Sequence, residues 1–409
     1  MLVTGGYVPR FHLCLPGLAV MQGRCGTAQS AYRWAAPVTQ ADEYERLRLF
    51  RNLTRWCNMT ETIFSLRQLD PQDGPAYAAV IAASPDTGTI GSTLRFEIDA
   101  YQALMALHKD TIGVVAETPG YAGFVGSGLI RFGQCQWEGE VRSSALLNTL
   151  VVHPDYRRRG LASQLAKWRE EFARQRIGEA GTVWAIIQQN NTGSEWTAHK
   201  WASQFLASCL AFVPLRMRSV PPPRNKHFDV RPVRLDDLDT VVEQLNQYYR
   251  EYNLYFPETK SSLAAWLHDT PFDSPFRHYR IVTDKAGSIV AGMGLAENYR
   301  LRTTLITHLP FVLRVLNLVF RIVPANGEMR EIALSRLWYA PGQMEAARHL
   351  LETTRWEWRK RGTSILLYTD IHSQVMGLLG LQDRGSKGLA SIAVRAPVPY
   401  TEGRLCYYA

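Results

Sequence analysis

The sequence is poor in lysine, in paired cysteines and in long apolar stretches. Of its 46 basic residues, 8 are lysine and 38 are arginine. Arginine binds phosphate in a planar, two-pronged way, although GC-rich coding produces the same bias. The excess over 37 acidic residues gives a net charge of +9, which permits an anionic partner without requiring one. No basic stripe with interleaved aromatic residues occurs, so nucleic-acid binding is not expected.

The most apolar segment, 309–323, contains Arg314 and Arg321 and is too short and too charged to span a bilayer. We therefore expect no transmembrane segment. Arg314, Asn317 and Arg321 recur at helical spacing, which predicts a helix with one narrow polar stripe. Such a helix would be buried at a domain or subunit contact, or would form a lid over an apolar substrate. Membrane-surface contact through 309–323 is not expected.

Six cysteines are scattered through the chain without any Cys-x-x-Cys pair. Neither a zinc site nor a disulfide framework is indicated, and no metal is expected. Reduced, mostly buried thiols are typical of a cytoplasmic protein, which is the expected location.

Residues 1–41 contain no carboxylate and carry Arg10, Arg24 and Arg33. An acid-poor, arginine-bearing arm resembles an organelle transit segment, but it also suits a loosely ordered tail or a translation start nearer Met21. We expect residues 1–41 to form a flexible N-terminal arm.

The rest of the chain divides at a proline-rich linker. At about 100–200 residues per domain, a chain of 409 residues predicts two domains or three. Residues 219–227 contain three consecutive prolines, which favour an extended linker. We therefore expect one domain over residues 42–218 and a second over residues 228–409.

Both halves show the same order of expected elements. Each begins with a strand followed by an aspartate that opens a helix, near Asp70 in the first half and Asp236 in the second. Strands follow, and in each half one runs into a proline, Pro154 or Pro341, ahead of an amphipathic helix and a further strand. The repeated order indicates an internal duplication. Alternating strands and helices predict an α/β fold with a mixed sheet.

The most informative stretch is 150–162, where a β-branched strand runs into a turn with three arginines, a glycine and then a helix. A helix N-terminus presents free N–H groups and partial positive charge, so it can hold an anion. Gly160 lacks a Cβ and lets a phosphate approach the backbone, and the small Ala162 keeps that approach open. Three adjacent arginines cannot all face one ligand, so one or two would flank it.

A V-x-P-x-x-R-x-x-G-x-A spacing within this stretch resembles the acyl-CoA-binding signature of the GNAT acetyltransferase superfamily. Its fixed positions in this chain are Val152, Pro154, Arg157, Gly160 and Ala162. The resemblance implies tandem GNAT-like acyl-CoA N-acyltransferase folds of the α/β class, with a mixed, mostly antiparallel sheet flanked by helices. It extends over residues 62–217 and, more weakly, over residues 228–395.

The resemblance also implies which residues bind the acyl-CoA co-substrate, which we expect to be acetyl-CoA. Backbone groups of 150–152 would pair with the pantetheine arm, and N–H groups of 158–163 would hold the pyrophosphate. Asn190 or Asn191 would contact the pantetheine, although an asparagine there is equally a helix-entry residue. The expected binding residues are Leu150, Val151, Val152, Arg157, Arg158, Arg159, Gly160, Leu161, Ala162, Ser163, Asn190 and Asn191.

The acid–base groups usual in the family are missing from this chain. The two positions ahead of Leu150, where many members carry a carboxylate, hold asparagine and threonine. The helix expected at 194–208 lacks the tyrosine that often serves as general acid. The remaining catalytic candidates are Glu138 and Glu140, acting through water, and His199 on that helix. An ordinary surface or packing role is the more usual one for each of the three.

The second half lacks the anion-binding motif. Aligned on the two prolines, it has Met344, Glu345 and Ala347 in place of the first arginine, the second arginine and the glycine. A carboxylate at this point would repel a pyrophosphate. We expect a degenerate copy that kept the fold and lost CoA, and that lines the acceptor cleft or forms a dimer contact.

The expected function is an acyl-CoA-dependent N-acyltransferase, an enzyme that transfers acetyl from acetyl-CoA directly to an amine of a small molecule. One alternative is N-acetylation of a protein or peptide. Another is a regulatory module that binds acyl-CoA without turnover. The sequence leaves open whether the chain forms a homodimer.

Overall fold

The computed structural model describes residues 64–86, 90–320, 323–380, 383 and 387–407. The description below concerns the unit Thr62–Ala409. The N-terminal arm expected at 1–41 lies outside the described residues.

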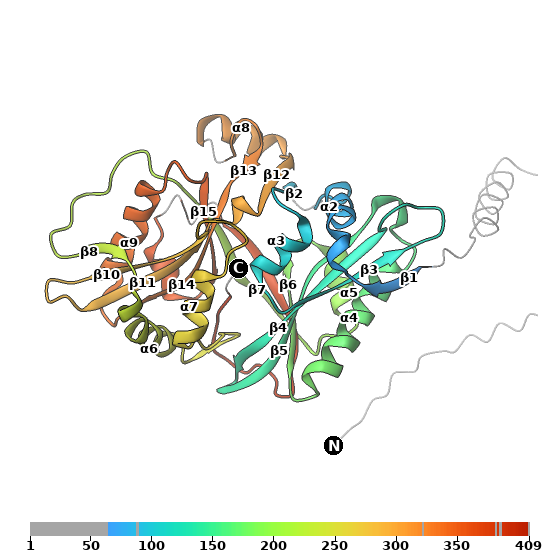
Figure 1. Ribbon diagram of the computed structural model, residues 1–409, viewed down its shortest axis with the longest axis horizontal. Helices are drawn as coiled ribbons and strands as arrows, with labels where there is room; N and C mark the ends of the chain where they lie inside the picture. Colours follow the sequence, from blue (N-terminus) through green and yellow to red (C-terminus); the bar gives the residue numbers. More distant parts are fainter. Residues whose placement is uncertain (1–63, 87–89, 321–322, 381–382, 384–386, 408–409) are drawn as a thin grey trace, which may run out of the picture. The chain divides into compact units, whose positions relative to one another are not determined.

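A twelve-stranded sheet runs through this unit (Figure 1). Its strands, in order across the sheet, are β1 (Ser65–Gln68), β3 (Thr111–Glu117), β4 (Gly126–Trp137), β5 (Glu140–Val152), β6 (Thr182–Gln188), β16 (Gly388–Arg395), β7 (Gln204–Arg216), β15 (Ser364–Asp370), β14 (Glu331–Tyr339), β11 (Ile289–Ala296), β10 (Arg277–Thr283) and β8 (Asp229–Pro232). Neighbouring strands are antiparallel except for the parallel pairs β5–β6 and β14–β15. The expected α/β fold with a mixed, mostly antiparallel sheet is confirmed.

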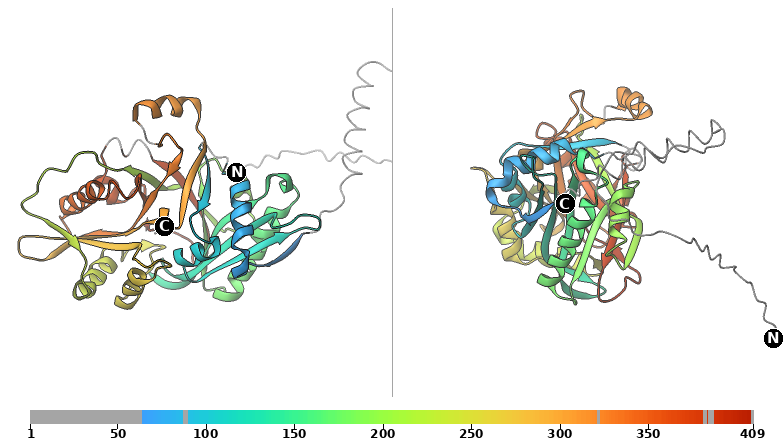
Figure 2. Two further views of the ribbon diagram at one scale, coloured as in Figure 1. Left: turned by 45° about the horizontal axis from the view of Figure 1, so that its top comes forward. Right: turned by 90° about the vertical axis from the view of Figure 1, so that its right-hand side faces the viewer.

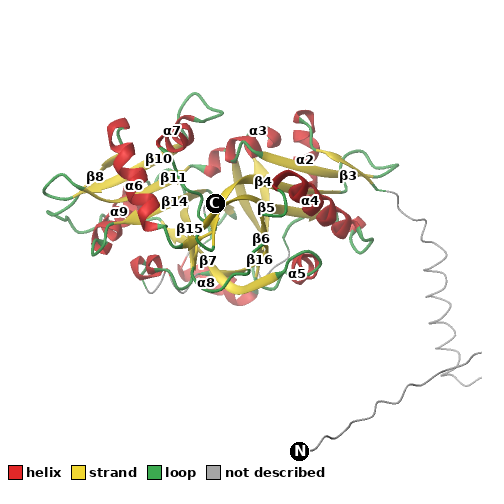
Figure 3. Cartoon of the chain, turned by 90° about the horizontal axis from the view of Figure 1, so that it is seen from below, coloured by secondary structure: helices red, strands yellow, loops and turns green. Residues whose placement is uncertain are grey.

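Helices lie along both sides of these strands (Figure 3). The α-helices are α2 (Gly74–Ala83), α3 (Ala100–Leu107), α4 (Leu161–Ile177), α5 (Thr192–Ala198), α6 (Leu238–Tyr248), α7 (Lys260–His268), α8 (Phe311–Phe320) and α9 (Met344–Glu357). Short 3-10 turns are η1 (Pro71–Asp73), η2 (Pro154–Tyr156), η3 (Leu235–Asp237), η4 (Asn298–Arg300) and η5 (Gln374–Leu378). Smaller sheets pair β13 (Glu328–Met329), β12 (Arg302–His308) and β2 (Gly91–Phe96), and β17 (Arg404–Leu405) with β9 (Tyr252–Asn253).

The two halves repeat the same polar contact where each begins. Nη1 and Nη2 of Arg67 on β1 donate hydrogen bonds to the carboxylate of Asp73, at 2.6 and 2.9 Å. Nη1 and Nη2 of Arg231 on β8 donate to the carboxylate of Asp237 at the same two distances. In each case the hydrogen bonds of the arginine hold the pKa of the aspartate below its usual value, although burial opposes the shift. Such a repeat is what an internal duplication predicts.

The last long strand of each half pairs with the other half. β7 lies against β15, and β16 is inserted between β6 and β7. The helix expected at 194–208 is therefore shorter than predicted, because α5 ends at Ala198 and β7 begins at Gln204. Strands on both sides of β7 satisfy its backbone, a contact between distant segments that local sequence does not reveal. The domain boundaries at 219–227 stay a prediction.

Helix α8 stands away from the large sheet (Figures 1 and 2). Phe311 is 77% exposed and Val315 is 47% exposed, so these two side chains are not buried within the unit. The side chain of Asn317, from the predicted polar stripe, bonds the backbone of Val323 through both its oxygen and its nitrogen. Among the described residues, no helix combines the length and the apolar character that crossing a bilayer requires.

Candidate active site

Strands β5 and β6 open a notch in the middle of the large sheet. They pair in parallel only from Ser144 to Leu146 on β5. Beyond Leu146, β6 continues with β16 as its partner, while β5 continues to Val152 against β4. The edge of β5 over residues 147–152 therefore has no strand partner on its β6 side, although side chains bond the carbonyls of Asn148 and Val152.

A bulge at Thr149 shapes the mouth of this notch. The register steps from Leu129 opposite Asn148 to Gly128 opposite Leu150, which leaves Thr149 unpaired with φ of 43°. A positive φ at a β-branched residue is strained, and such strain is typical of functional sites.

Arg169 of α4 stabilises the bulge through hydrogen bonds to the backbone beside it. The side chain is buried, and its Nη1 donates to the carbonyls of Asn148 at 2.9 Å and Leu129 at 3.3 Å. Burial lowers the pKa of Arg169 to about 10, which leaves the guanidinium charged at neutral pH. Gly128 makes room for it, because a Cβ there would lie 2.7 Å from the arginine Cδ.

The N-terminus of α4 lies where the sequence motif predicts it. Gly160 is the N-cap, with φ of 81° and no side-chain cap hydrogen bond. The N–H groups of Gly160, Leu161 and Ala162 have no acceptor among the described residues. Apart from its two chain neighbours, no described atom lies within 4 Å of a Cβ built on Gly160, so the space beside this Cα is open. Free donors at a helix N-terminus form an anion site.

The three arginines of the loop are exposed and differ in direction. Nε of Arg157 donates to the carbonyl of Val152 at 3.1 Å, and Nη2 of Arg159 donates to the carbonyl of Asp155 at 2.9 Å. Arg158 adopts φ of 62°. Arg157 and Arg159 therefore bond their own loop, as expected if the three side chains do not share one ligand.

A lysine that the sequence analysis missed adds charge beside the same helix end. Nζ of Lys200 donates to Oγ of Ser163 at 2.9 Å and lies 3.5 Å from the ring centre of Trp196. The four-residue step from Trp196 to Lys200 was the only available signal.

The two asparagines after β6 have different surroundings. Oδ1 of Asn191 accepts from the N–H of Ser194 at 3.1 Å, so this side chain caps α5. Asn190 is exposed and has φ of 70°. The helix-entry role is thus occupied by Asn191.

The catalytic candidates lie apart from the notch mouth. Glu140 begins β5, is 69% exposed and pairs with Arg142 at 2.6 Å. Ten residues of strand separate it from Leu150, which corresponds to about 33 Å. Glu138 lies in the turn between β4 and β5. Its carboxylate accepts hydrogen bonds from Asn253 at 2.8 Å and from Thr401 at 2.6 Å.

His199 follows α5 and is exposed. Its ring stacks on Phe205 with centroids 3.9 Å apart. The structure therefore places Glu138 and Glu140 in one hairpin and His199 elsewhere. Within the part of the chain that the structure describes, no three His, Cys, Asp or Glu side chains gather as a metal site requires.

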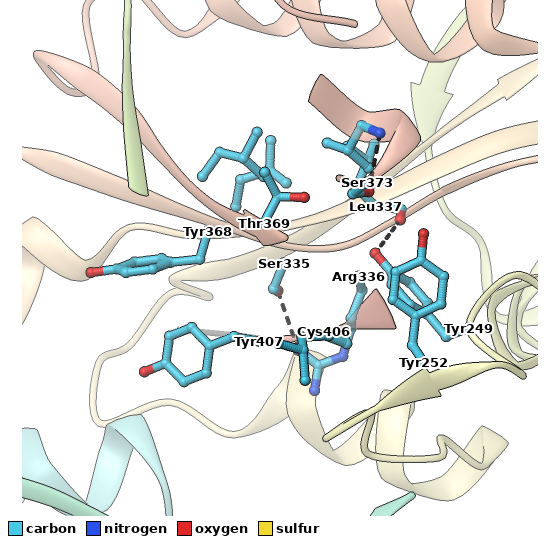
Figure 4. A pocket seen from close by; sticks show the side chains of 14 residues that line it. Tyr249, Tyr252, Ser335, Arg336, Leu337, Tyr368, Thr369, Ser373, Cys406 and Tyr407 are labelled. Atoms are coloured by element: carbon cyan, nitrogen blue, oxygen red, sulfur yellow. Dashed lines mark hydrogen bonds between the residues drawn. The ribbon is translucent and has the colours of Figure 1, made fainter. Parts of the chain in front are cut away.

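The second half repeats the notch in a closed form. Strands β14 and β15 pair only as far as Leu334 and Leu367, and Arg336 occupies a bulge with φ of 53°. The hydroxyls of Tyr249 and Tyr279 donate to the carbonyls of Leu337 and Arg336. The cavity that remains has a volume of about 20 Å³, room for about one water molecule (Figure 4).

The first two turns of the helix beside this closed notch contact η5. Met344 opens α9, and its Sδ lies 3.4 Å from a Cβ built on Gly377 of η5. Arg348 of α9 donates to the carbonyl of the same glycine at 3.0 Å. Among the described residues, tyrosine hydroxyls therefore already bond the bulge carbonyls of β14, and side chains of α9 contact η5.

Comparison with known proteins agrees with this geometry. Residues 87–197, which include the loop, α4 and the end of β5, match the model of a family described as the acetyltransferase (GNAT) family. The chain contains a GNAT domain.

Solved structures share the fold over most of the chain. A GCN5-related N-acetyltransferase from Sphaerobacter thermophilus is 15% identical, with a TM-score of 0.54 over 83% of this chain and 97% of that one. The N-myristoyltransferase of Saccharomyces cerevisiae, solved with bound myristoyl-CoA, is 12% identical, with a TM-score of 0.56 over 82% and 83%. These likenesses extend the GNAT-like fold beyond the family match. No curated protein matches the sequence.

Proposed function

We propose that this protein is an acyl-CoA-dependent N-acyltransferase whose acyl-CoA site is built by the GNAT domain. One observation carries the proposal: the open helix end at Gly160 and the unpaired edge of β5 belong to consecutive segments of the chain. One ligand could place an anionic group at the helix end and an extended arm along the strand edge. CoA has both parts, a pyrophosphate and a pantetheine arm.

The binding roles follow from the free groups of the chain. The N–H groups of Gly160, Leu161 and Ala162 would hold the pyrophosphate, and Arg158 and Lys200 would add positive charge. The backbone of 150–152 would pair with the pantetheine amides. The bound thioester supplies the acyl group, and the Thr149 bulge would orient its carbonyl.

Buried tyrosines act as hydrogen-bond donors in this scheme. Burial raises the pKa of Tyr77, beside the Thr149 bulge, and of Tyr407, whose ring lies 5.9 Å from Trp184 of β6, so their hydroxyls keep their protons at neutral pH. They can donate hydrogen bonds to a developing oxyanion or thiolate but do not serve as bases. The amine proton would pass to water, because asparagine and threonine occupy positions 148 and 149.

The decisive experiment follows thiol release from acyl-CoA. The purified chain is titrated with CoA by calorimetry and then assayed for free thiol with an amine panel and acyl-CoAs from acetyl to myristoyl. We expect CoA binding and amine-dependent release, with acetyl-CoA the best donor. The long-chain arm is included because the N-myristoyltransferase neighbour was solved with myristoyl-CoA. Binding without release on any amine would favour the regulatory module, and absence of binding would refute the proposal.

A further inference from the structure

A groove outside the candidate active site lies between helix α2 and strand β2. Its volume is about 350 Å³, which is within the range of ligand pockets. The two elements lie side by side (Figure 1). None of the residues that line the groove belongs to the proposed CoA site. The groove is therefore a separate candidate for a binding site.

Most of the groove wall is apolar. Helix α2 contributes Pro75, Ala78 and Ala82, which share one side of the helix. Ala82 is exposed and Ala78 is half-buried. The other apolar side chains come from β2, the residues after it and β12: Leu94, Phe96, Ile98 and Leu305. Burial of a ligand's apolar side chains against this wall would be favourable.

The groove also contains an unpaired strand edge. β2 is the edge strand of its three-stranded sheet and has β12 on one side only. Ser92 exchanges both of its backbone hydrogen bonds with Asp86 on the open side, at 2.7 and 3.2 Å. Because backbone groups point to alternate sides along a strand, those of Leu94 and Phe96 also point to the open side. There the N–H and C=O groups of both residues have no hydrogen-bond partner among the described residues.

An unpaired strand edge is complementary to another extended backbone. A peptide in the groove would pair with Leu94 and Phe96 as an added strand, and every second side chain of the peptide would face the apolar wall. A compact small molecule could bond only part of such a row of donors and acceptors. The backbone groups of β2 therefore favour an extended peptide as the ligand.

The charges along the groove are acidic on balance. Arg95 in the groove wall pairs with two glutamates, Glu97 at 3.0 Å and Glu328 at 2.6 Å, which leaves one negative charge in excess. Asp99, also in the wall, accepts from the N–H of Gln102 at 3.0 Å and forms no ion pair with any described residue. The whole chain has a net charge of +9, so this acidic excess is a local feature. A basic ligand complements it.

We propose that the groove between α2 and β2 binds an extended peptide segment in which apolar and basic side chains alternate. The peptide backbone would pair with Leu94 and Phe96, its apolar side chains would pack on the groove wall, and a lysine or arginine would approach Asp99. The inference goes beyond the proposed acyl transfer and does not depend on it, because it concerns binding at a separate surface. A second copy of the chain fits less well, since it would bring the same acidic excess to the contact.

The test measures the fluorescence anisotropy of labelled hexapeptides with the full chain. One probe alternates valine and lysine, a second alternates valine and glutamate, and a third is the lysine probe with N-methylated backbone amides. We expect the lysine probe to bind at least about 10-fold more tightly than the other two, which meet like charge or lack strand donors. The net charge of +9 favours the glutamate probe, so the two charge effects predict opposite orders. Equal affinities, a tighter glutamate probe or no binding of any probe would overturn the inference.

Variants of the groove wall test where the lysine probe binds. Ala82→Phe places a ring in the groove, whereas Ala79→Phe places the same ring at an exposed position of α2 that does not line it. We expect affinity to fall at least about 10-fold in Ala82→Phe and to stay unchanged in Ala79→Phe. Asp99→Asn, which keeps the cap of α3, should weaken binding about 5-fold. Binding that survives Ala82→Phe would refute the site.

Two further measurements separate the alternatives. A dimer in gel filtration that Ala82→Phe dissociates and Ala79→Phe does not would assign the edge of β2 to a second copy and overturn the inference. Calorimetric titration with CoA distinguishes this site from the proposed function. Absence of CoA binding would refute the acyltransferase and leave the groove standing, whereas CoA binding without peptide binding would refute the groove alone.

Discussion

At the scale of single residues, a substitution at Gly160 tests the proposed CoA site most directly. An aspartate there would place a carboxylate at the helix end and repel the pyrophosphate, so we expect Gly160→Asp to weaken CoA binding at least about 30-fold, on the order of 2 kcal/mol. Gly139→Asp is a matched control, because both glycines have φ of 81° and open space at the Cβ position. Calorimetric titration should show lost affinity in Gly160→Asp only. Equal loss in both variants would assign the effect to backbone strain.

A second residue-scale prediction concerns the support beneath the bulge. Gly128→Ala would force its Cβ against the stem of Arg169, and overpacking of this kind costs about 1–3 kcal/mol. The urea midpoint should fall, whereas Gly193→Ala, which meets no atom within 4 Å, should leave it nearly unchanged. Adding Arg169→Ala to Gly128→Ala should cost less than the two single changes summed, because the clash is gone. Strict additivity would contradict the contact.

At the scale of elements, what the sequence could predict depended on whether the signal was local. The turn and α4 were predictable, since the residues from Val152 to Ala162 are contiguous and their spacing mirrors the geometry. The exchange of β7 and β16 was not, because each strand is defined by partners from the other half. Lys200 was also missed, since 37 residues of chain separate it from Ser163 and only the folded chain brings the two side chains together.

At the scale of elements, the closed notch of the second half predicts how many CoA molecules each chain binds. Tyrosine hydroxyls occupy the bulge carbonyls of β14, and Glu345 in the first turn of α9 would repel a pyrophosphate, so we expect no CoA to bind there. Calorimetric titration should therefore give one CoA per chain. A stoichiometry of two would contradict the description of the second half as a degenerate copy.

At the scale of the whole unit, the halves are joined by pairings that neither can make alone. β16 fills the space between β6 and β7, β7 continues into β15, and β2 of the first half pairs with β12 of the second. Without the second half, β6 and β7 would expose unpaired backbone edges and their apolar faces.

The strands exchanged between the halves predict that cleaving the linker and removing the second half have different effects on folding. The linker around Arg224 lies outside every strand, so cleavage of the chain between residues 224 and 225 breaks no described strand pairing. Fragments 1–224 and 225–409, produced together, should co-elute in gel filtration, melt cooperatively and bind CoA. Fragment 1–224 alone should aggregate or lack a cooperative melt, although it holds every residue of the proposed CoA site. A stable lone fragment with full CoA affinity would show that the exchanged strands are dispensable, because the first half would then close its own sheet without β16.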